Sequence, residues 1–409
     1  MHRNARTTVW TEPLWALFGT AALFYLPLFM KDAGLSTIEI GVIVSINLYL
    51  AAVIQLAAGV VTDRLGRKRA TLLFDTTSWV IPMAIWAFSG NFWWFLVGYV
   101  LNATSKVVGV SFWLLATEDS PEAHRPRIFA AIKVIILLGG LLVPIVGVFA
   151  QRYGEVPTFR ILFVLGSIAM LVHNLIRNAL CEETTAGKQA MHRSRSTSVH
   201  EQLVDSTRIF RAAMRHPTLW RVTVFYLATS IANQLNIFLS IYLARYLNLS
   251  AVATALAPAV AAAAALFCYL GAMPYAERRV AVPRLAMASA ALAAVGWFVF
   301  LAVPLGGIGL LIASVATFSA GAFCLESYRD ATVVSCVHPD ERAALFAAVQ
   351  SVTAVVSIPA GFVSAVLFDM SPRALFFAIS LLYAVAFCCA LGRHFGANVI
   401  DRVVTPRQD

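Results

Sequence analysis

The chain has 409 residues, of which 60% are hydrophobic and only 13% are charged, and its formal net charge is +10. Soluble domains carry about 25% charged residues, so a water-soluble monomer of this composition would have too little polar surface to cover itself. The composition excludes a large soluble domain and predicts a membrane protein. The positive charge does not by itself indicate nucleic acid, because most charges fall in short gaps between apolar segments.

Apolar runs of about 18 or more residues recur along the whole chain, and each predicts a membrane-spanning helix. Their continuity excludes an outer-membrane barrel, whose strands alternate in polarity. We interpret the first run as a retained helix, because no small-residue cleavage site follows the N-terminal segment. We therefore expect an all-α integral membrane protein with twelve transmembrane helices, at residues 13–30, 38–62, 71–89, 92–118, 126–150, 158–180, 218–246, 250–275, 283–304, 306–334, 341–367 and 373–394.

Basic residues are distributed unequally between the two sides of these spans. With the N-terminus inside, most of the 31 Lys and Arg residues fall on the cytoplasmic side. The outer side receives only a few, namely Lys31, Arg152, Arg160, Arg245 and Arg373. Because cytoplasmic loops of membrane proteins carry an excess of Lys and Arg, we expect both termini in the cytoplasm.

The stretch "GVVTDRLGRKRATL", residues 59–72, concentrates charge between the second and third spans. It holds one acidic residue, Asp63, followed by several basic residues. A simple basic loop that touches anionic lipid would have the same net charge. The order of the residues, more than their number, is therefore the informative feature.

Polar side chains also interrupt the spans. A charge near the bilayer centre costs about 2.5–3.5 kcal/mol on insertion scales, so it usually faces a cavity or a partner. Lys106 in the fourth span is predicted either to contact substrate or a coupling proton, or to form a structural ion pair. In the tenth span, Glu326 and Asp330 share a helix face and Arg329 can pair with Glu326. Glu326 is the favoured proton-coupling residue, with a static ion pair as the alternative.

Uncharged groups could extend such a polar lining through hydrogen bonds. The candidates are Tyr25, Asn102, Asn233, Gln234 and Asn236. For any one of them, helix packing is the favoured role and substrate binding the alternative.

The polar segment 181–217 divides the chain into an N-terminal bundle, residues 1–180, and a C-terminal bundle, residues 218–409. Its start is rich in Ser and Thr, which is typical of a flexible linker. Its end places Val199, Leu203, Phe210 and Met214 near helical spacing, which suits an amphipathic helix at the membrane surface. An unstructured linker is the alternative.

The two halves show weak internal similarity. "EDSPEAHRPRIFAA" begins at Glu118 and "SCVHPDERAALFAA" begins at Ser335, and Pro144 has a counterpart in Pro359 at nearly the same separation. Landmarks at a nearly constant offset indicate duplication of a six-span unit. Two six-span halves related by an axis along the membrane normal are the architecture of one class of transporters.

With this architecture, the charged stretch resembles the signature of the major facilitator superfamily. That signature reads Gly, any, Leu, Ala, Asp, Arg, any, Gly, Arg, Lys, any, any, Leu between the second and third spans. Here Val61, Thr62 and Thr71 replace Leu, Ala and Leu, and the Asp-Arg-x-Gly-Arg-Lys core is intact. The resemblance covers the whole chain and points to a poorly characterised bacterial branch. It implies two pseudo-symmetric six-helix bundles in the bacterial cytoplasmic (inner) membrane.

In the proteins that the chain resembles, this loop locks the outward-facing state. A carboxylate is stabilised at a helix N-terminus, so Asp63 is expected to face the start of the eleventh helix. The basic residues are expected to reach Glu118 and Asp119 at the inner end of the fourth helix, while Gly66 permits a tight turn and Gly59 a close helix contact. The implied gating residues are Gly59, Asp63, Arg64, Gly66, Arg67, Lys68, Glu118 and Asp119.

A second family signature, found in the fifth helix of exporters driven by proton exchange, is partly present. Gly140, Pro144 and Gly147 match it in rough spacing, while Val143 and Val148 replace two of its glycines. Small residues and Pro also allow close packing and a bend whatever the substrate is. The family further implies that helices 1, 4, 7 and 10 line the central cavity.

The sequence thus predicts a secondary transporter that works by alternating access. We expect a proton-coupled exporter of amphipathic or drug-like compounds, with uptake of a small polar or anionic solute as the alternative. No nucleotide-binding loop, metal-ligand cluster or nucleophile constellation is apparent, so we expect no cofactor, no metal and no enzymatic activity. A sensor or enzyme on the same scaffold is the alternative from another class. The expected partners are a small molecule, protons and membrane lipid, with no nucleic acid and a monomeric state.

Overall fold

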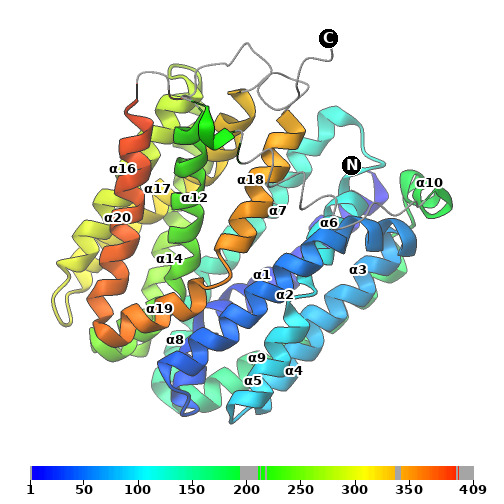
Figure 1. The fold of residues 1–409 in the computed structure, drawn as a ribbon. Coiled ribbons are helices and arrows are strands. Elements are labelled where there is room, and N and C mark those ends of the chain that lie inside the picture. The colour runs from blue at the N-terminus through cyan, green and yellow to red at the C-terminus, as the bar shows by residue number, and fades with distance from the viewer. Residues whose placement is uncertain are drawn as a thin grey trace. The chain divides into compact units, whose positions relative to one another are not determined.

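The computed structural model of the chain describes residues 2–193, 211, 213–216, 219–336, 342–392 and 395. These ranges contain helices and no β-strand. The chain divides into two compact units: unit 1 comprises residues 1–197 and 240–259, and unit 2 comprises residues 198–239 and 260–409 (Figure 1). Unit 1 therefore holds the first six spans together with the end of the seventh span and the start of the eighth.

The described residues include 11 helices that are long and apolar enough to cross a membrane. A further pair, Ala348–Val356 and Ala360–Met370, is bent by 42° at a short break and makes a twelfth span when it is counted as one. The expected all-α membrane fold with twelve spans is confirmed. The first helix begins at Arg3 and not at residue 13, because its polar first turns are buried: Asn4, Thr8 and Glu12 are each no more than 5% exposed.

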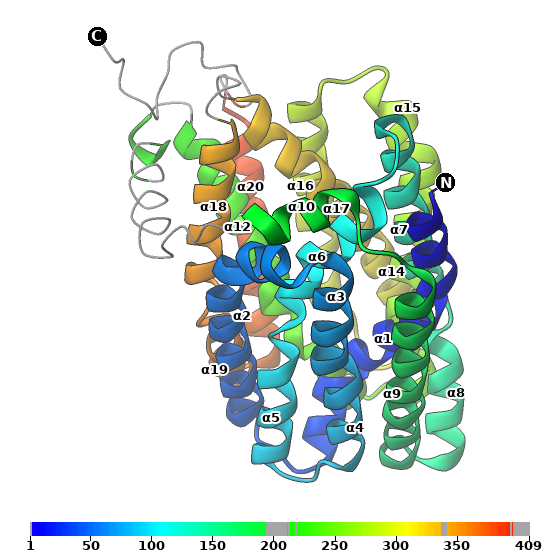
Figure 2. The ribbon, with the colours of Figure 1, turned by 90° about the vertical axis from the view of Figure 1, so that its right-hand side faces the viewer.

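Unit 1 is built around α1, which packs against α7 and α9. Helix α6 packs against α2 and α3, and α4 packs against α5 and α9 (Figure 2). The helices are α1 (Arg3–Asp32), α2 (Thr37–Leu65), α3 (Arg67–Asp75), α4 (Ile81–Phe88), α5 (Phe92–Asn102), α6 (Ser105–Thr117), α7 (Arg125–Leu141), α8 (Val143–Tyr153), α9 (Glu155–Leu180) and α10 (Thr185–Arg193).

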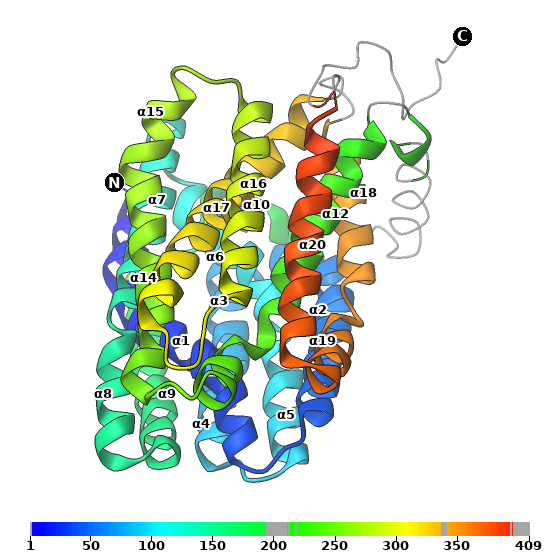
Figure 3. The same cartoon turned by 90° about the vertical axis from the view of Figure 1, so that its left-hand side faces the viewer.

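In unit 2, α16 packs against α17 and α20, and α20 packs against α12 (Figure 3). Along the chain, the two units change over within the short helix α13 and again within α14. The helices of this part of the chain are α12 (Leu219–Leu235), α13 (Leu239–Ile241), α14 (Ala251–Phe267), α15 (Met273–Glu277), α16 (Val282–Leu301), α17 (Ile308–Ser335), α18 (Arg342–Val356), α19 (Ala360–Met370) and α20 (Pro372–Ala390).

Three spans of unit 1 are interrupted where the sequence alone predicts continuous helices. The third span changes from α3 to a π-helical turn, Thr76–Val80, before α4 continues it. The fourth span breaks between α5 and α6, and the fifth between α7 and α8. A π-helical turn such as that of the third span is frequent at functional sites.

The start of the linker is folded onto unit 1. The amide of Asn4 in α1 donates to the Glu182 carbonyl at 2.9 Å, and the Glu182 amide returns a bond of 2.9 Å to the Asn4 side chain. Arg3 also pairs with the Glu182 carboxylate. The expected flexible start is therefore wrong for 182–193, where α10 follows. The expected amphipathic helix around Val199 to Phe210 lies outside the described residues.

Candidate functional site

The charged loop folds into a compact set of ion pairs at one end of unit 1. Arg67, the first residue of α3, is only 6% exposed. Its guanidinium donates to Asp63 in the last turn of α2 at 2.7 Å and to both oxygens of Glu118 at 3.0–3.3 Å. We call Asp63, Arg67 and Glu118, together with Glu183, the Arg67 cluster. The planar guanidinium suits this role because it can serve two carboxylates at once.

Glu183, from the first residues of the linker, completes this cluster and was not identified from the sequence. Its carboxylate accepts the backbone N–H groups of Arg67 at 2.9 Å and Lys68 at 3.0 Å, which lie at the start of α3. A carboxylate at this position satisfies N–H groups that have no partner within the helix. The only sequence signal was an acidic pair directly after the sixth span, within a segment interpreted as flexible.

Gly66 is required by this geometry in two ways. Its φ of 81° and ψ of 157° lie in a region that is nearly exclusive to glycine. A Cβ on Gly66 would also lie 2.5 Å from Oε2 of Glu183. Gly59 differs: a Cβ there would meet no described atom within 4 Å, so the close helix contact expected for it is not seen.

The remaining loop residues are less engaged. Asp119 accepts the backbone N–H of Thr185 at 3.1 Å, which ties α10 to the end of the fourth span. Among the described residues, the side chains of Arg64 and Lys68 form no hydrogen bond or ion pair, and Arg64 is exposed. The structure thus brings Arg67, Asp63 and Glu118 together. The contact of Asp63 with the eleventh helix stays a prediction.

A second ion-pair set joins segments that are distant in the chain. Arg245, in the π-helical turn that ends the seventh span, binds Asp32 at the end of α1 at 2.5 Å. The same guanidinium pairs with Glu155 at the start of α9. We call these three residues the Arg245 cluster. At this cluster α1 ends and α9 begins. The start of α1 and the end of α9 lie toward the Arg67 cluster, so the two clusters lie at opposite ends of unit 1.

A third arginine lies deep within unit 1 and was not among the residues predicted from the sequence. Arg177 of α9 has a side chain that is 3% exposed, and it pairs with Asp75 at the end of α3. It also donates to His173 Nε2 at 2.7 Å and to the Asn174 amide oxygen at 2.9 Å. His173 Nδ1 contacts the Thr11 carbonyl of α1 at 2.8 Å.

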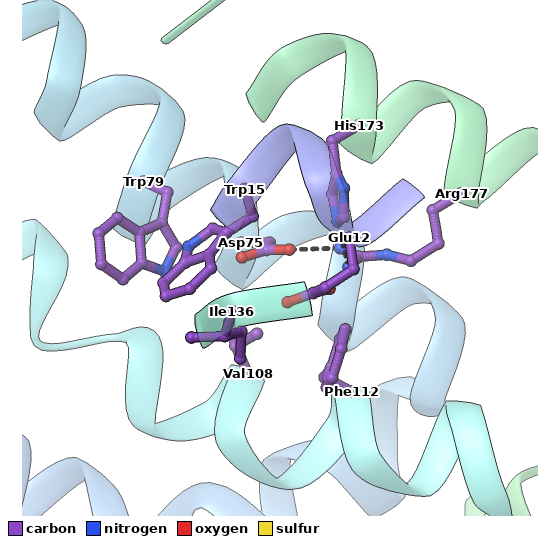
Figure 4. A pocket seen from close by; sticks show the side chains of 9 residues that line it. All are labelled: Glu12, Trp15, Asp75, Trp79, Val108, Phe112, Ile136, His173 and Arg177. Atoms are coloured by element: carbon purple, nitrogen blue, oxygen red, sulfur yellow. Dashed lines mark hydrogen bonds and ion pairs between the residues drawn. The ribbon is translucent and has the colours of Figure 1, made fainter. Parts of the chain in front are cut away.

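This network borders a cavity of about 170 Å³ (Figure 4). Glu12 of α1, which sequence reasoning missed, is 5% exposed and points toward the centre of the cavity. The cavity is lined by Glu12, Trp15, Asp75, Trp79, Val108, Phe112, Ile136, His173 and Arg177, which we call the Arg177 pocket. The sequence could have indicated this pocket, because ionisable groups are rare in or next to apolar runs. Four of its lining residues are ionisable and lie in such positions: Glu12, Asp75, His173 and Arg177.

The polar residues of the fourth span have different surroundings. Asn102, the last residue of α5, donates to the Ser78 carbonyl in the π-helical turn at 2.8 Å. It thereby holds the widened turn that follows Asp75. Lys106 in α6 is exposed and has no hydrogen bond or ion pair among the described residues. Tyr25 of α1 packs its buried ring against Phe159, with ring centroids 4.6 Å apart.

In unit 2 the tenth-span charges lie on α17. Arg329 donates to Asp330 at 3.0 Å and to the Ser230 hydroxyl at 3.0 Å, and it lies over the Tyr226 ring. Glu326 is exposed. On the seventh span, the predicted polar residues lie where α12 ends: Asn233 and Gln234 are exposed, and Asn236 starts a short 3-10 turn.

The partial fifth-span motif coincides with a break in the helix. Leu142 separates α7 from α8, and Pro144 lies in the first turn of α8, where its missing N–H is tolerated. Gly147 packs closely against the eighth span, because a Cβ there would lie 2.7 Å from the Ala255 Cβ and 2.8 Å from the Ala251 carbonyl. Gly140 is buried in the last turn of α7.

The family model described as Major Facilitator Superfamily matches residues 14–361, which include the charged loop, the fifth-span motif and the tenth span. The chain belongs to the major facilitator superfamily. Members are transporters, so this chain is a multi-pass membrane transporter and its family is not an enzyme family.

One relative is a transporter whose name states no substrate. The chain is 30% identical over 150 residues to the "Uncharacterized MFS-type transporter YhjO" of Bacillus subtilis (strain 168). This match covers 35% of the chain and spans about a third, 34%, of the relative.

Solved structures of the superfamily share the fold. The nucleoside transporter NupG matches with a TM-score of 0.71 at 14% identity, covering 95% of this chain and 98% of that one. A D-xylose-proton symporter matches with a TM-score of 0.72 at 13% identity, covering 97% and 99%. A POT family transporter in complex with 5-aminolevulinic acid matches with a TM-score of 0.68 at 15% identity, covering 95% of each. At these identities the likeness shows the fold alone.

Proposed function

We propose that this transporter uses the energy of a proton gradient to move a small molecule by alternating access. The observation that carries the proposal is the set of ion-pair clusters at opposite ends of unit 1. A transporter of this kind needs contacts that close one side of the membrane while the other side opens. The bundles 1–180 and 218–409, joined by the linker 181–217, are the bodies that would move.

The Arg67 cluster is the proposed latch of the cytoplasmic side, with both chain termini on that side. Arg67 is buried against Asp63 and Glu118, and Glu183 fixes the start of α3 beneath it. Asp63 keeps a side chain that is 46% exposed, so it retains oxygen lone pairs for a further donor. The positively polarised start of the eleventh helix is the proposed donor.

The Arg245 cluster is the proposed counterpart on the outer side. Arg245 belongs to the seventh span, whose first part lies in unit 2 and whose last part lies in unit 1. Its bonds to Asp32 and Glu155 hold this last part against α1 and α9. Neutralising either carboxylate would weaken the attachment of this segment, which is the behaviour required of a latch.

Spin labels test the latch proposal directly. In Asp63→Asn the amide oxygen is a weaker acceptor than a carboxylate. We expect distance distributions between labels at the inner helix ends of the two bundles to shift toward longer separations. Asp119→Asn is the matched control, because among the described residues Asp119 accepts only the backbone N–H of Thr185 in the linker. Equal distributions in Asp63→Asn and wild type would refute the role of Asp63.

Export of amphipathic compounds is the proposed direction. Its support is the fifth-span motif, which combines a helix break with close packing of Gly147 against the eighth span. Uptake of a small polar or anionic solute is the second candidate. Lys106 and Arg329 are candidate contacts for a polar or anionic solute in that case.

One experiment separates the two directions. The protein is reconstituted in liposomes with an imposed pH gradient, and ethidium, followed by its fluorescence, serves as the amphipathic probe. Antiport predicts dye accumulation in the more acidic compartment, and symport predicts accumulation in the opposite compartment. Collapse of the gradient with an ionophore is the control. Absence of gradient-driven movement across a broad panel of amphipathic and polar solutes would contradict proton coupling.

A further inference from the structure

Glu12 is the unusual member of the Arg177 pocket. Its residue exposure is 5%, yet its carboxylate forms no hydrogen bond or ion pair with any described residue. Figure 4 shows the carboxylate among the side chains that line the cavity, beside the ends of Arg177 and Asp75. An ionised carboxylate without hydrogen bonds is strongly disfavoured inside a protein, so this position needs a proton, a cation or water.

The neighbouring groups are already committed to one another. Arg177 has only donors, so the His173 nitrogen that it contacts must accept a hydrogen bond. The proton of His173 is then on Nδ1, from which it donates to the Thr11 carbonyl. His173 is therefore neutral, and it could bind a further proton only by losing its bond with Arg177.

One carboxylate of the Arg177 pocket has no compensating positive charge. Arg177 carries one positive charge and its paired Asp75 one negative charge, while His173 is neutral. An ionised Glu12 would give the pocket a net charge of minus one, and a protonated Glu12 would make it neutral. The negatively charged pocket favours contact with water, and the neutral pocket favours a closed, dry environment, because an uncompensated buried charge is costly.

Among the described residues that line the pocket, Arg177 is the only lysine or arginine. Helix α9 contributes His173 and Arg177, and α3 contributes Asp75. The residues that line the cavity from α6 and α7 are apolar, namely Val108, Phe112 and Ile136. No lining residue comes from α2 or α8, which also pack against α1.

The chemistry of the pocket favours a proton over a metal ion. A metal ion would need several oxygen or nitrogen ligands, and no group of three or more His, Cys, Asp or Glu residues among the described ones could hold one. Asp75 is already engaged by Arg177. A cavity of about 170 Å³ can hold several water molecules, each needing about 30 Å³, and water can carry a proton to Glu12.

The surrounding backbone is able to respond to such a change. Asp75 is the last residue of α3 before the π-helical turn, and Pro13, directly after Glu12, removes one backbone hydrogen bond from α1. Helices α1, α3 and α9 therefore meet at two irregular positions. Uptake of a proton at Glu12 would alter the attraction between α1 and the Arg177 side chain of α9.

We propose that Glu12 is the group that binds and releases a proton in the Arg177 pocket, and that this pocket couples proton movement to the transport cycle. The assignment rests on the proposed proton-coupled transport and gives it a site within unit 1, separate from Glu326. The reaction is a simple protonation: one proton adds to a Glu12 carboxylate oxygen from water in the cavity and later returns to water. No bond other than that O–H bond is made or broken.

Infrared difference spectroscopy of the purified protein tests the site with the proton itself as the ligand. In wild type we expect a C=O stretching band of a protonated carboxylic acid that decreases as the pH is raised and shifts in heavy water. Glu12→Gln, which mimics the neutral form and should fold normally, is expected to lose this band completely. Glu326→Gln is the matched control and is expected to keep it.

The results of this experiment and of the liposome assay distinguish a wrong assignment of Glu12 from a wrong transport mechanism. A band retained in Glu12→Gln would overturn the assignment of Glu12, even if the liposomes show proton-driven flux. A band lost in Glu12→Gln, with no gradient-driven flux in wild type, would support the proton site and overturn its coupling to transport. A wild-type pocket that responds to Na⁺ at constant pH, and loses this response in Glu12→Gln, would replace the proton by a metal cation.

Discussion

Two buried arginines of unit 1 are surrounded by similar groups and differ in one respect. Arg67 and Arg177 each lie near two carboxylates from other helices or turns. Both carboxylates near the Arg67 guanidinium, Asp63 and Glu118, are bonded to it. Near Arg177 only Asp75 is bonded, and Glu12 faces a cavity.

This difference fits the two roles proposed here, a latch for the Arg67 cluster and a proton site for the Arg177 pocket. In the Arg67 cluster each carboxylate has a hydrogen-bond donor in place, so the cluster changes only when its parts move apart. In the Arg177 pocket one charge can be neutralised by a proton while the helices stay packed. The number of charges in a buried cluster therefore matters less than whether each charge has a fixed partner.

The largest expected effect concerns the arginine of the pocket. Arg177→Met leaves Asp75 and Glu12 buried without a cation, and breaking a buried ion pair costs about 3–5 kcal/mol. We expect a large fall in the thermal unfolding temperature in detergent, measured by fluorescence-detected size exclusion. The double variant Arg177→Met/Asp75→Asn should regain part of the loss. Equal stability of the single and double variants would contradict the pairing.

A smaller effect is expected in the Arg67 cluster. Arg67→Met leaves Glu118, whose side chain is only 15% exposed, without its main donor, and an unsatisfied buried group costs about 1–3 kcal/mol. The loss should be smaller than in Arg177→Met, because the Asp63 side chain is 46% exposed and remains hydrated. Arg67→Lys should lie in between, since a lysine keeps the charge but cannot serve both carboxylates in the same way. The same unfolding assay ranks the three variants, and an Arg67→Met loss as large as that of Arg177→Met would remove the distinction between the two clusters.

The sequence predicted the fold well and one of these two clusters in part. Apolar runs of sufficient length identify spans whatever their packing, and the ordered charges of residues 59–72 identified Arg67 with Glu118. Glu183 was missed, because a carboxylate that caps a helix from a linker has no periodic pattern. The start of the linker, which contains Glu183, was interpreted as flexible because it is rich in Ser and Thr.

The pocket was missed for a different physical reason. Glu12, Asp75 and Arg177 come from three spans, and only their packing brings them to one cavity. Glu12 also precedes the apolar core of the first span, so it looked like part of a polar N-terminal segment. The buried first turns of α1 could not be recognised before their partners in α9 and the linker were known.

The glycine at the turn of the Arg67 cluster should tolerate no side chain. Gly66→Ala places a Cβ in a backbone region that costs about 1–3 kcal/mol for other residues, and 2.5 Å from Glu183. In a Glu183→Ala background we expect the cost of Gly66→Ala to fall, because the collision is removed and only the backbone strain remains. A double-mutant cycle of unfolding temperatures measures the difference. An additive cycle would show that Glu183 does not approach Gly66 in solution.

The smallest expected effect distinguishes the two glycines of the same motif. Gly59 lies within α2, and a Cβ there meets no described atom within 4 Å. Gly59→Ala should therefore stabilise the helix by about 0.5–1 kcal/mol, the usual gain when alanine replaces a helical glycine. If Gly59 is needed only in another state of the cycle, the variant will be at least as stable as wild type and yet transport more slowly. Measuring unfolding and liposome flux on the same preparation separates these cases: lower stability would show a close contact of Gly59 in the resting state.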